Sequence, residues 1–219
     1  MKTTKYSILF TFLFFAISFL DILGVVLEHS MLQNIFKPMI ILSLMVLYYN
    51  SVTTKNYWYL LALAFSFLGD VFLLDKNNLF IIGIAAFLIT QLLYIKIIWK
   101  QIKQATFTQK IIAVIPFMIY LFVLLSLLRD NLKELLIPVV VYGSAISVFG
   151  MVALLNYVVD KNKNNSALLL GAIFFIASDS MIALHKFYQE QPFYGVAIMS
   201  TYVIAQYLIY LFMKRESLS

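Results

Sequence analysis

Residues 57–74 carry the stretch that decides the fold class, YWYLLALAFSFLGDVFLL. The stretch is almost continuously apolar and contains a single charged residue, Asp70. A helix that crosses a bilayer needs about 20 mostly apolar residues. Strands of a membrane β-barrel would instead alternate polar and apolar residues over about 10 positions. The stretch therefore predicts a membrane-spanning helix with one buried acid.

The composition of the whole chain extends that prediction. Of the 219 residues, 63% are hydrophobic and 12% are charged, whereas a soluble domain is about half apolar and about a quarter charged. A soluble fold of this size cannot bury so much apolar surface. With no Cys and only 2 His, disulfides, cysteine nucleophiles and histidine-based metal sites are not expected. We therefore expect an all-α polytopic membrane protein with no metal and no cofactor.

Eight segments have the length and apolarity of a membrane span. They predict a single transmembrane domain over residues 1–219, with spans at 6–27, 31–49, 57–74, 79–99, 110–128, 135–159, 166–184 and 191–213. The first span is expected to remain as a helix, because its apolar run is too long for a cleaved signal and is interrupted by Asp21. An even number of spans places the two termini on the same side.

Positive charges predict which side that is. Eleven Lys and Arg residues fall on the side of the termini, and four fall on the other side, namely Lys76, Arg129, Lys133 and Lys186. Cytoplasmic loops carry the excess of Lys and Arg, so both termini are predicted to be cytoplasmic. The protein is then a multi-pass protein of the cell membrane, here the bacterial inner membrane. The same rule accounts for the net charge of +6 without nucleic acid as a partner.

The two halves of the chain resemble each other. Asp70 in the third span and Asp179 in the seventh occupy corresponding positions, about half the chain apart. Weaker matches, in consistent order, pair Asp21 with Asp130, Phe36-Lys37-Pro38 with Leu136-Ile137-Pro138, and Gln91 with Gln206. We therefore predict two parallel four-helix repeats, about residues 1–105 and 106–219. Asp70 and Asp179 would face each other across the axis between them.

Ionisable side chains inside spans cost about 2.5–3.5 kcal/mol each at mid-helix, so they mark candidate functional positions. At about 1.5 Å of rise per residue, the acids in the first, third and seventh spans and Lys37 all fall in the outer half of the bilayer. Polar groups of the fourth and eighth spans lie slightly deeper. We predict a single polar pocket that opens toward the outer face, formed by Asp21, Lys37, Asp70, Gln91, Asp179, Tyr202 and Gln206.

Asp70 and Asp179 are the strongest candidates, because no cation lies one helical turn away on either span. Two carboxylates that share a low-dielectric pocket are not expected both to ionise, so the pair can hold a proton. Such a pair suits acid–base catalysis, and it equally suits a proton-coupled carrier. The other polar groups could instead have structural roles. Asp21 and Lys37 could form an ion pair with each other, and Gln91 and Gln206 could form hydrogen bonds between helices. Tyr94 and Tyr202 could be packing residues.

Five motifs resemble those of a known family. They are Phe36-Lys37-Pro38, Leu68-Gly69-Asp70, Phe87-x-x-x-Gln91-x-x-Tyr94, Ser178-Asp179-Ser180 and Tyr202-x-x-Ala205-Gln206. In order and spacing they resemble the YhhN-like family, which includes the lysoplasmalogenases. The resemblance covers nearly the whole chain, from about the second span to the eighth. At position 91 many members of that family have a histidine where this chain has a glutamine.

The resemblance implies a lysoplasmalogenase-like ether hydrolase whose partners are an alkenyl-ether lysophospholipid and membrane lipids. It would cleave the vinyl-ether bond and release a fatty aldehyde and a glycerophospho-head group. The reaction needs a positioned acid and a nearby carboxylate, roles that Asp70 and Asp179 would share. Lys37 would bind the phosphate, and the other candidate substrate-binding residues are Asp21, Gln91, Tyr94, Tyr202 and Gln206.

Other classes of membrane protein fit less well. A proton-coupled transporter of a small or lipidic substrate is the main alternative, but Pro38, Pro116, Pro138 and Pro192 fall near predicted span ends, which disfavours broken transport helices. A presenilin-like aspartyl protease would need a Gly-x-Gly-Asp pattern, and Phe67 replaces its first glycine. A metal-dependent lipid hydrolase with three intramembrane histidines does not fit a chain with 2 His.

Overall fold

The computed structural model describes residues 2–75 and 78–217, with side chains from Ser7 onward. These residues form eight α-helices and one short 3-10 helix. In chain order they are α1 (Lys2–Val26), α2 (Ser30–Ser51), α3 (Tyr57–Phe72), α4 (Phe80–Trp99), α5 (Phe107–Leu132), η1 (Lys133–Leu135), α6 (Leu136–Val159), α7 (Lys163–Phe187) and α8 (Tyr194–Glu216). No strand occurs among them, so the all-α prediction is confirmed.

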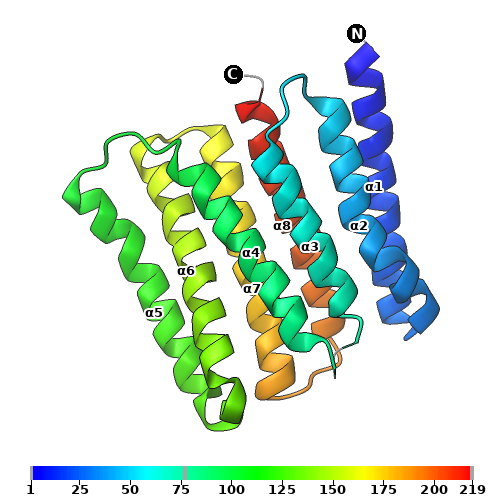
Figure 1. Ribbon diagram of the computed structural model, residues 1–219, viewed down its shortest axis with the longest axis vertical. Coiled ribbons are helices and arrows are strands. Elements are labelled where there is room, and N and C mark those ends of the chain that lie inside the picture. Colours follow the sequence, from blue (N-terminus) through cyan, green and yellow to red (C-terminus); the bar gives the residue numbers. More distant parts are fainter. Residues whose placement is uncertain (1, 76–77, 218–219) are drawn as a thin grey trace.

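Consecutive helices run in opposite directions and form a bundle, with both termini at the same end (Figure 1). The pairs α1–α2, α3–α4, α5–α6 and α7–α8 pack as hairpins, while α4 packs on α6 and α2 packs on α8. Lys55 and Lys103 lie at the end of the termini, and Arg129 and Lys186 lie at the opposite end, as the sequence predicts. Lys76 lies outside the described residues. The cytoplasmic orientation of the termini stays a prediction.

Among the described residues, six helical segments are long enough and apolar enough to cross a membrane. One of them, residues 107–159, comprises both α5 and α6, whereas α3 has 16 residues and is shorter than a usual span. A multi-pass helical membrane protein is therefore confirmed. Crossing by all eight helices stays a prediction.

Short polar motifs begin the helices that start at the end of the termini. The Asn56 side chain accepts hydrogen bonds from the backbone N–H groups of Trp58 and Tyr59 at 3.0 and 3.3 Å and begins α3. Thr106 forms a capping box with Gln109 at the start of α5, and Asn162 caps α7. These side chains satisfy N–H groups that have no partner within the helix, which explains why α3, α5 and α7 begin where they do.

Two prolines lie further inside helices than the sequence pattern indicated. Pro38 lies within α2 and Pro116 within α5, and both helices continue past the proline without interruption. The expectation that both lie near span ends is therefore wrong, because each helix starts well before its proline. The helices remain unbroken, so the argument against discontinuous transport helices still holds.

Large apolar side chains face outward on the outer helices. Phe12 on α1 is 72% exposed, and Phe122 on α5 is 73% exposed. Contiguous apolar surface of this kind is rare on soluble monomers and typical of a surface solvated by lipid. The polar side chains described below are instead buried between helices, which is the expected arrangement for polar groups at membrane depth.

Candidate active site

Two carboxylates with tyrosine partners lie inside the bundle. Asp70, on α3, is 2% exposed, and the Tyr202 hydroxyl on α8 donates a hydrogen bond to its Oδ2 at 2.8 Å. Asp179, on α7, is partly buried and accepts a hydrogen bond at Oδ2 from the Tyr142 hydroxyl on α6. The two carboxylates interact electrostatically with each other. Asp70 and Asp179 thus each have one tyrosine partner inside the bundle; that the two acids together form the site stays a prediction.

Neither carboxylate forms an ion pair. No described Lys or Arg nitrogen lies within 4.0 Å of Asp70, Asp179 or Asp21. Lys37 interacts electrostatically with both Asp70 and Asp21, but at a longer range. The ion-pair alternative for Asp21 and Lys37 is therefore not formed in the described part of the chain.

A cavity of about 540 Å³ opens at the end of the bundle opposite the termini. Asp21 and Lys37 line it, and Asp21 is fully buried with no hydrogen-bond partner for either oxygen among the described residues. The other lining residues are Val25, Ser30, Gln33, Asn34, Leu73, Leu74, Phe80, Ile182, His185, Lys186, Glu190, Gly195, Ile198 and Met199. The cavity is therefore lined by both acidic and basic side chains.

A second, smaller hollow of about 40 Å³ lies beside Asp179. Its polar lining consists of Asp179 and Tyr142, and its apolar walls come from α4, α6 and α7. Leu73, Phe80 and Ile182 line both this hollow and the larger cavity. The two spaces therefore adjoin, with a polar compartment near Lys37 and an apolar one near Asp179.

Gln206 and Tyr94 lie in a buried hydrogen-bond network rather than in the cavity wall. The Tyr94 hydroxyl donates to Gln206 Oε1 at 3.0 Å, and Gln206 Nε2 donates to Ser66 Oγ at 3.2 Å. Ser66 in turn donates to Thr90 Oγ1 at 3.4 Å. These bonds join α3, α4 and α8, the interhelical role that amides commonly have in membrane helices. The polar residues expected in one pocket are thus separated: Asp21 and Lys37 line the cavity, Asp179 lines the hollow, and Gln206 joins the network, whereas Asp70, Tyr202 and Gln91 line neither space.

Gln91 differs from Gln206. It is fully buried on α4, and neither its amide nitrogen nor its amide oxygen has a hydrogen-bond partner among the described residues. The amide lies near the Tyr142 hydroxyl, which donates to Asp179. A buried amide without partners is costly, and no described residue compensates the burial of Gln91 with a hydrogen bond.

Tyr142 is the residue of this site that the sequence did not reveal. The chain has 14 Tyr, and nothing in the local sequence distinguishes Tyr142 from those that pack. The sequence offers only its position along the helix. Tyr142 lies in the second turn of α6, and Asp179 lies about two turns before the end of α7, so the two residues are at a similar level of the bundle. Only the packing of α6 against α7 shows that the two side chains meet.

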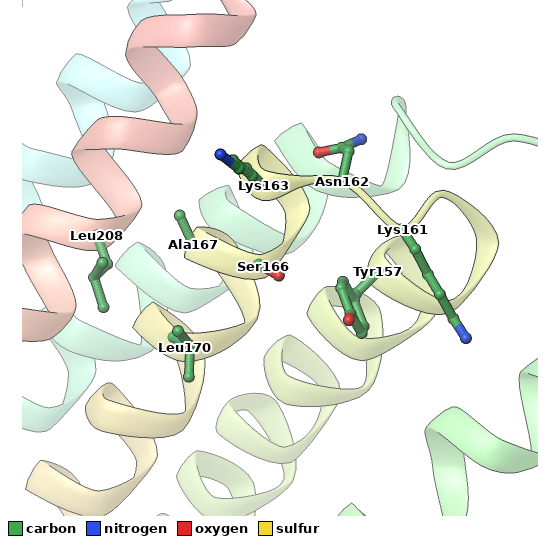
Figure 2. Close-up of a pocket in the computed structure, with 8 residues that line it drawn as sticks. All are labelled: Tyr157, Lys161, Asn162, Lys163, Ser166, Ala167, Leu170 and Leu208. Atoms are coloured by element: carbon green, nitrogen blue, oxygen red, sulfur yellow. The ribbon is translucent and has the colours of Figure 1, made fainter.

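Another cavity, of about 470 Å³, lies at the end of the termini between α6, α7 and α8 (Figure 2). Lys161 and Lys163 point in different directions there, and Tyr157 and Ser166 lie between them. No carboxylate lines this cavity. It offers no acid–base pair, so the arrangement around Asp70 and Asp179 is the better candidate. In the described parts of the chain, no three His, Asp or Glu side chains gather as potential metal ligands.

The fold defines a helical, multi-pass membrane protein that carries acidic side chains between its helices. The chain belongs to the YhhN family, whose model matches residues 32–213; the resemblance predicted from the sequence motifs is confirmed. The chain is 33% identical over 152 residues to lysoplasmalogenase TMEM86A of Homo sapiens. That alignment covers 67% of this chain but only 61% of the human protein. No solved structure matches the chain.

Proposed function

We propose that this protein is a membrane-embedded hydrolase that cleaves the vinyl-ether bond of lysoplasmalogens. The observation that carries the proposal is the pair of carboxylates Asp70 and Asp179, each bound to one tyrosine hydroxyl and neither neutralised by an ion pair. Membership of the YhhN family and similarity to a human lysoplasmalogenase support it. Acid catalysis between helices requires this kind of group, because a carboxylate without a cation partner in a low-dielectric site readily holds a proton.

The reaction proceeds by acid catalysis. A carboxylic acid transfers its proton to the β-carbon of the vinyl ether, and the double bond's electrons form the new C–H bond. The resulting oxocarbenium ion is captured at the α-carbon by water, whose proton passes to a carboxylate. The hemiacetal then collapses: its C–O bond breaks, the glycerol oxygen takes a proton, and a fatty aldehyde leaves. One water is consumed and no redox partner is needed. A positioned general acid contributes about 10²–10⁴-fold to such a step.

The positions of the two acids favour different roles. Asp179 borders the hollow that would receive the vinyl-ether carbons, so we assign it the role of proton donor. Asp70 is 2% exposed and held by Tyr202, so we assign it the stabilisation of the developing cation, which a fixed nearby charge does effectively in a dry site. We assign Gln91, whose buried amide has no hydrogen-bond partner among the described residues, the role of holding the attacking water. Lys37 lines the adjoining polar cavity and would bind the phosphate.

The substrate would lie across both spaces. Its head group would occupy the polar cavity, and its vinyl-ether group would lie past Leu73, Phe80 and Ile182 at the apolar hollow. We place the cavity on the outer side of the membrane, with cytoplasmic termini, because of the distribution of Lys and Arg. The packing of α2 on α8 and of α4 on α6 supports the two-repeat arrangement that would set the acids opposite each other.

The test is fatty-aldehyde release from 1-alkenyl-lysophosphatidylethanolamine by the purified, detergent-solubilised protein with a chelator present. Asp70→Asn and Asp179→Asn should each lower turnover by at least about 100-fold. Asp160→Asn is the matched control, because Asp160 lies at the opposite end of the bundle in an exposed pair with Lys103, 3.2 Å away. Thermal unfolding of each variant checks that it folds.

Three results would contradict the proposal in different ways. Full turnover in either Asp70→Asn or Asp179→Asn would remove that acid from the mechanism. Turnover that disappears with chelator would require a metal-dependent mechanism instead. A folded wild-type protein without turnover on any alkenyl lysolipid would favour the transporter alternative.

A further inference from the structure

We infer that the cavity lined by Asp21 and Lys37 is a head-group site that selects a phosphate linked to a primary ammonium, as in phosphoethanolamine, over the quaternary ammonium of choline. The inference rests on the proposed function, since it specifies the head group of that lysolipid. It concerns the end of the substrate away from the carboxylate pair. It is carried by Asp21 and Lys37 in the cavity wall, neither of which forms an ion pair among the described residues.

Asp21 supplies the recognition of the ammonium. It is fully buried on α1, yet it lines the cavity, and neither of its oxygens accepts a hydrogen bond from a described residue. No described basic nitrogen lies within 4.0 Å of it. A buried carboxylate is stable only when it is paired or hydrogen-bonded. A ligand that brings several N–H donors and a positive charge would satisfy both oxygens together.

Lys37 supplies the recognition of the phosphate. It lines the same cavity from α2 and interacts electrostatically with Asp21 without forming an ion pair. Gln33 and Asn34, one turn earlier on α2, add amide groups to the same wall. A cation and an anion that line one cavity without forming an ion pair with each other match a zwitterion, whose phosphate and ammonium are separated by a short linker. A purely anionic head group would leave Asp21 without a partner.

The cavity is poorly suited to choline. A quaternary ammonium has no N–H to donate and is recognised instead by several aromatic faces. Phe80 is the one Phe, Tyr or Trp among the described lining residues. Its ring already carries the Lys186 ammonium, 4.3 Å from the ring centroid. The wall therefore offers hydrogen-bond acceptors rather than an aromatic cage.

The position of the cavity fits one lysolipid. Leu73, Phe80 and Ile182 line both the cavity and the hollow beside Asp179. A head group held by Asp21 and Lys37 would thus direct its chain past these residues toward the carboxylate pair. Head-group recognition and reaction would occur in adjoining spaces.

The experiment measures binding without turnover. Saturated 1-alkyl-lysophospholipids lack the vinyl group, so they report affinity alone, measured by isothermal titration of the purified protein in detergent. The probes are the ethanolamine, N-methyl, N,N-dimethyl and choline lysolipids. Wild-type protein should bind the ethanolamine lysolipid about tenfold more tightly than the choline lysolipid, with affinity falling stepwise as each N–H is lost. Asp21→Asn should reduce that ratio to near one.

Asp130→Asn is the matched control, because Asp130 is exposed at the same end of the bundle and outside the cavity; it should keep the wild-type ratio. Three results would overturn the inference. They are equal wild-type affinities for all four lysolipids, no binding of any of them, and an unchanged ethanolamine-to-choline affinity ratio in a folded Asp21→Asn protein. The wild-type series needs no variant, so a failure of Asp21→Asn to fold leaves the test intact. Selective binding without aldehyde release would contradict the proposed hydrolysis alone, and hydrolysis without head-group preference would contradict the head-group site alone.

Discussion

Tyr202 on α8 donates a hydrogen bond of 2.8 Å to Asp70 on α3, across 132 residues of sequence. The ring of Tyr202 also packs edge-on against Phe87 and Phe175, with centroid distances of 6.0 and 5.8 Å. The phenol is thus held by α4 and α7 while its hydroxyl orients a carboxylate of α3. Four helices meet at this pair, so the orientation of Asp70 depends on the packing of the whole bundle.

Removing the Tyr202 hydroxyl should misplace Asp70 without disrupting the fold. Tyr202→Phe keeps the ring contacts and deletes only the hydrogen bond, and a bond to a charged group contributes about 1.5–3 kcal/mol. We expect turnover to fall by at least about tenfold while the protein remains folded. Aldehyde release is the measurement, and Tyr188→Phe, an exposed tyrosine at the end of α7, is the control. Unchanged turnover in Tyr202→Phe would show that Asp70 needs no such orientation.

Replacing Gln91 should stabilise the protein and at the same time lower its activity. Because neither amide atom has a hydrogen-bond partner in the described chain, Gln91→Leu replaces a buried unsatisfied group with an apolar one of similar size. We expect the free energy of unfolding to rise by about 1–3 kcal/mol, seen as a higher melting temperature, while aldehyde release falls. Gln104 lies in the exposed loop between α4 and α5, so Gln104→Leu should change neither the melting temperature nor aldehyde release. A less stable Gln91→Leu protein would mean that the amide is satisfied in the membrane.

Lys37 should affect substrate binding more than chemistry. It lines the cavity rather than the hollow beside Asp179, so a phosphate contact would be equally strong in ground and transition states. Lys37→Gln is therefore expected to raise KM about tenfold with little change in kcat. Lys110→Gln, at the exposed start of α5, is the charge-matched control. A large fall in kcat with KM unchanged would place Lys37 in the chemical step instead.

Gly69 should be required for the approach of α3 to α4. A Cβ at this position would lie 2.6 Å from the ring atoms of Phe87, the ring that packs against Tyr202. Gly69→Ala is expected to lower the free energy of unfolding by about 1–3 kcal/mol through overpacking and to reduce turnover as Phe87 shifts. Gly143→Ala meets only one side-chain atom, Leu121 Cδ1 at 3.1 Å, and should be milder. Equal melting temperatures for the two variants would refute this packing argument.

Much of the fold could be read from the chain, because a bilayer imposes simple rules. Long apolar runs must become helices, since only helices satisfy all their backbone groups within one segment. The apolar run predicted the start of α3 at Tyr57 correctly, whereas α7 begins at Lys163, three residues before the predicted start, because the Asn162 side chain caps it there. The continuity of α2 through Pro38 did not follow, because its outcome depends on how neighbouring helices support the backbone near the proline.

The sequence by itself determined the class of protein and its helices, and it singled out Asp70 and Asp179 as candidate site residues, because a charge within an apolar run is costly wherever the run lies in the bundle. Only the tertiary structure decided which groups meet those acids. Tyr142 and Tyr202 reach them from helices far along the chain, whereas Gln206 joins a network and Gln91 has no partner among the described residues. Apolar helices resemble one another in composition, so the side chains that meet are set by the rotation and crossing of the helices, which follow from close packing at particular contacts such as Gly69 against Phe87.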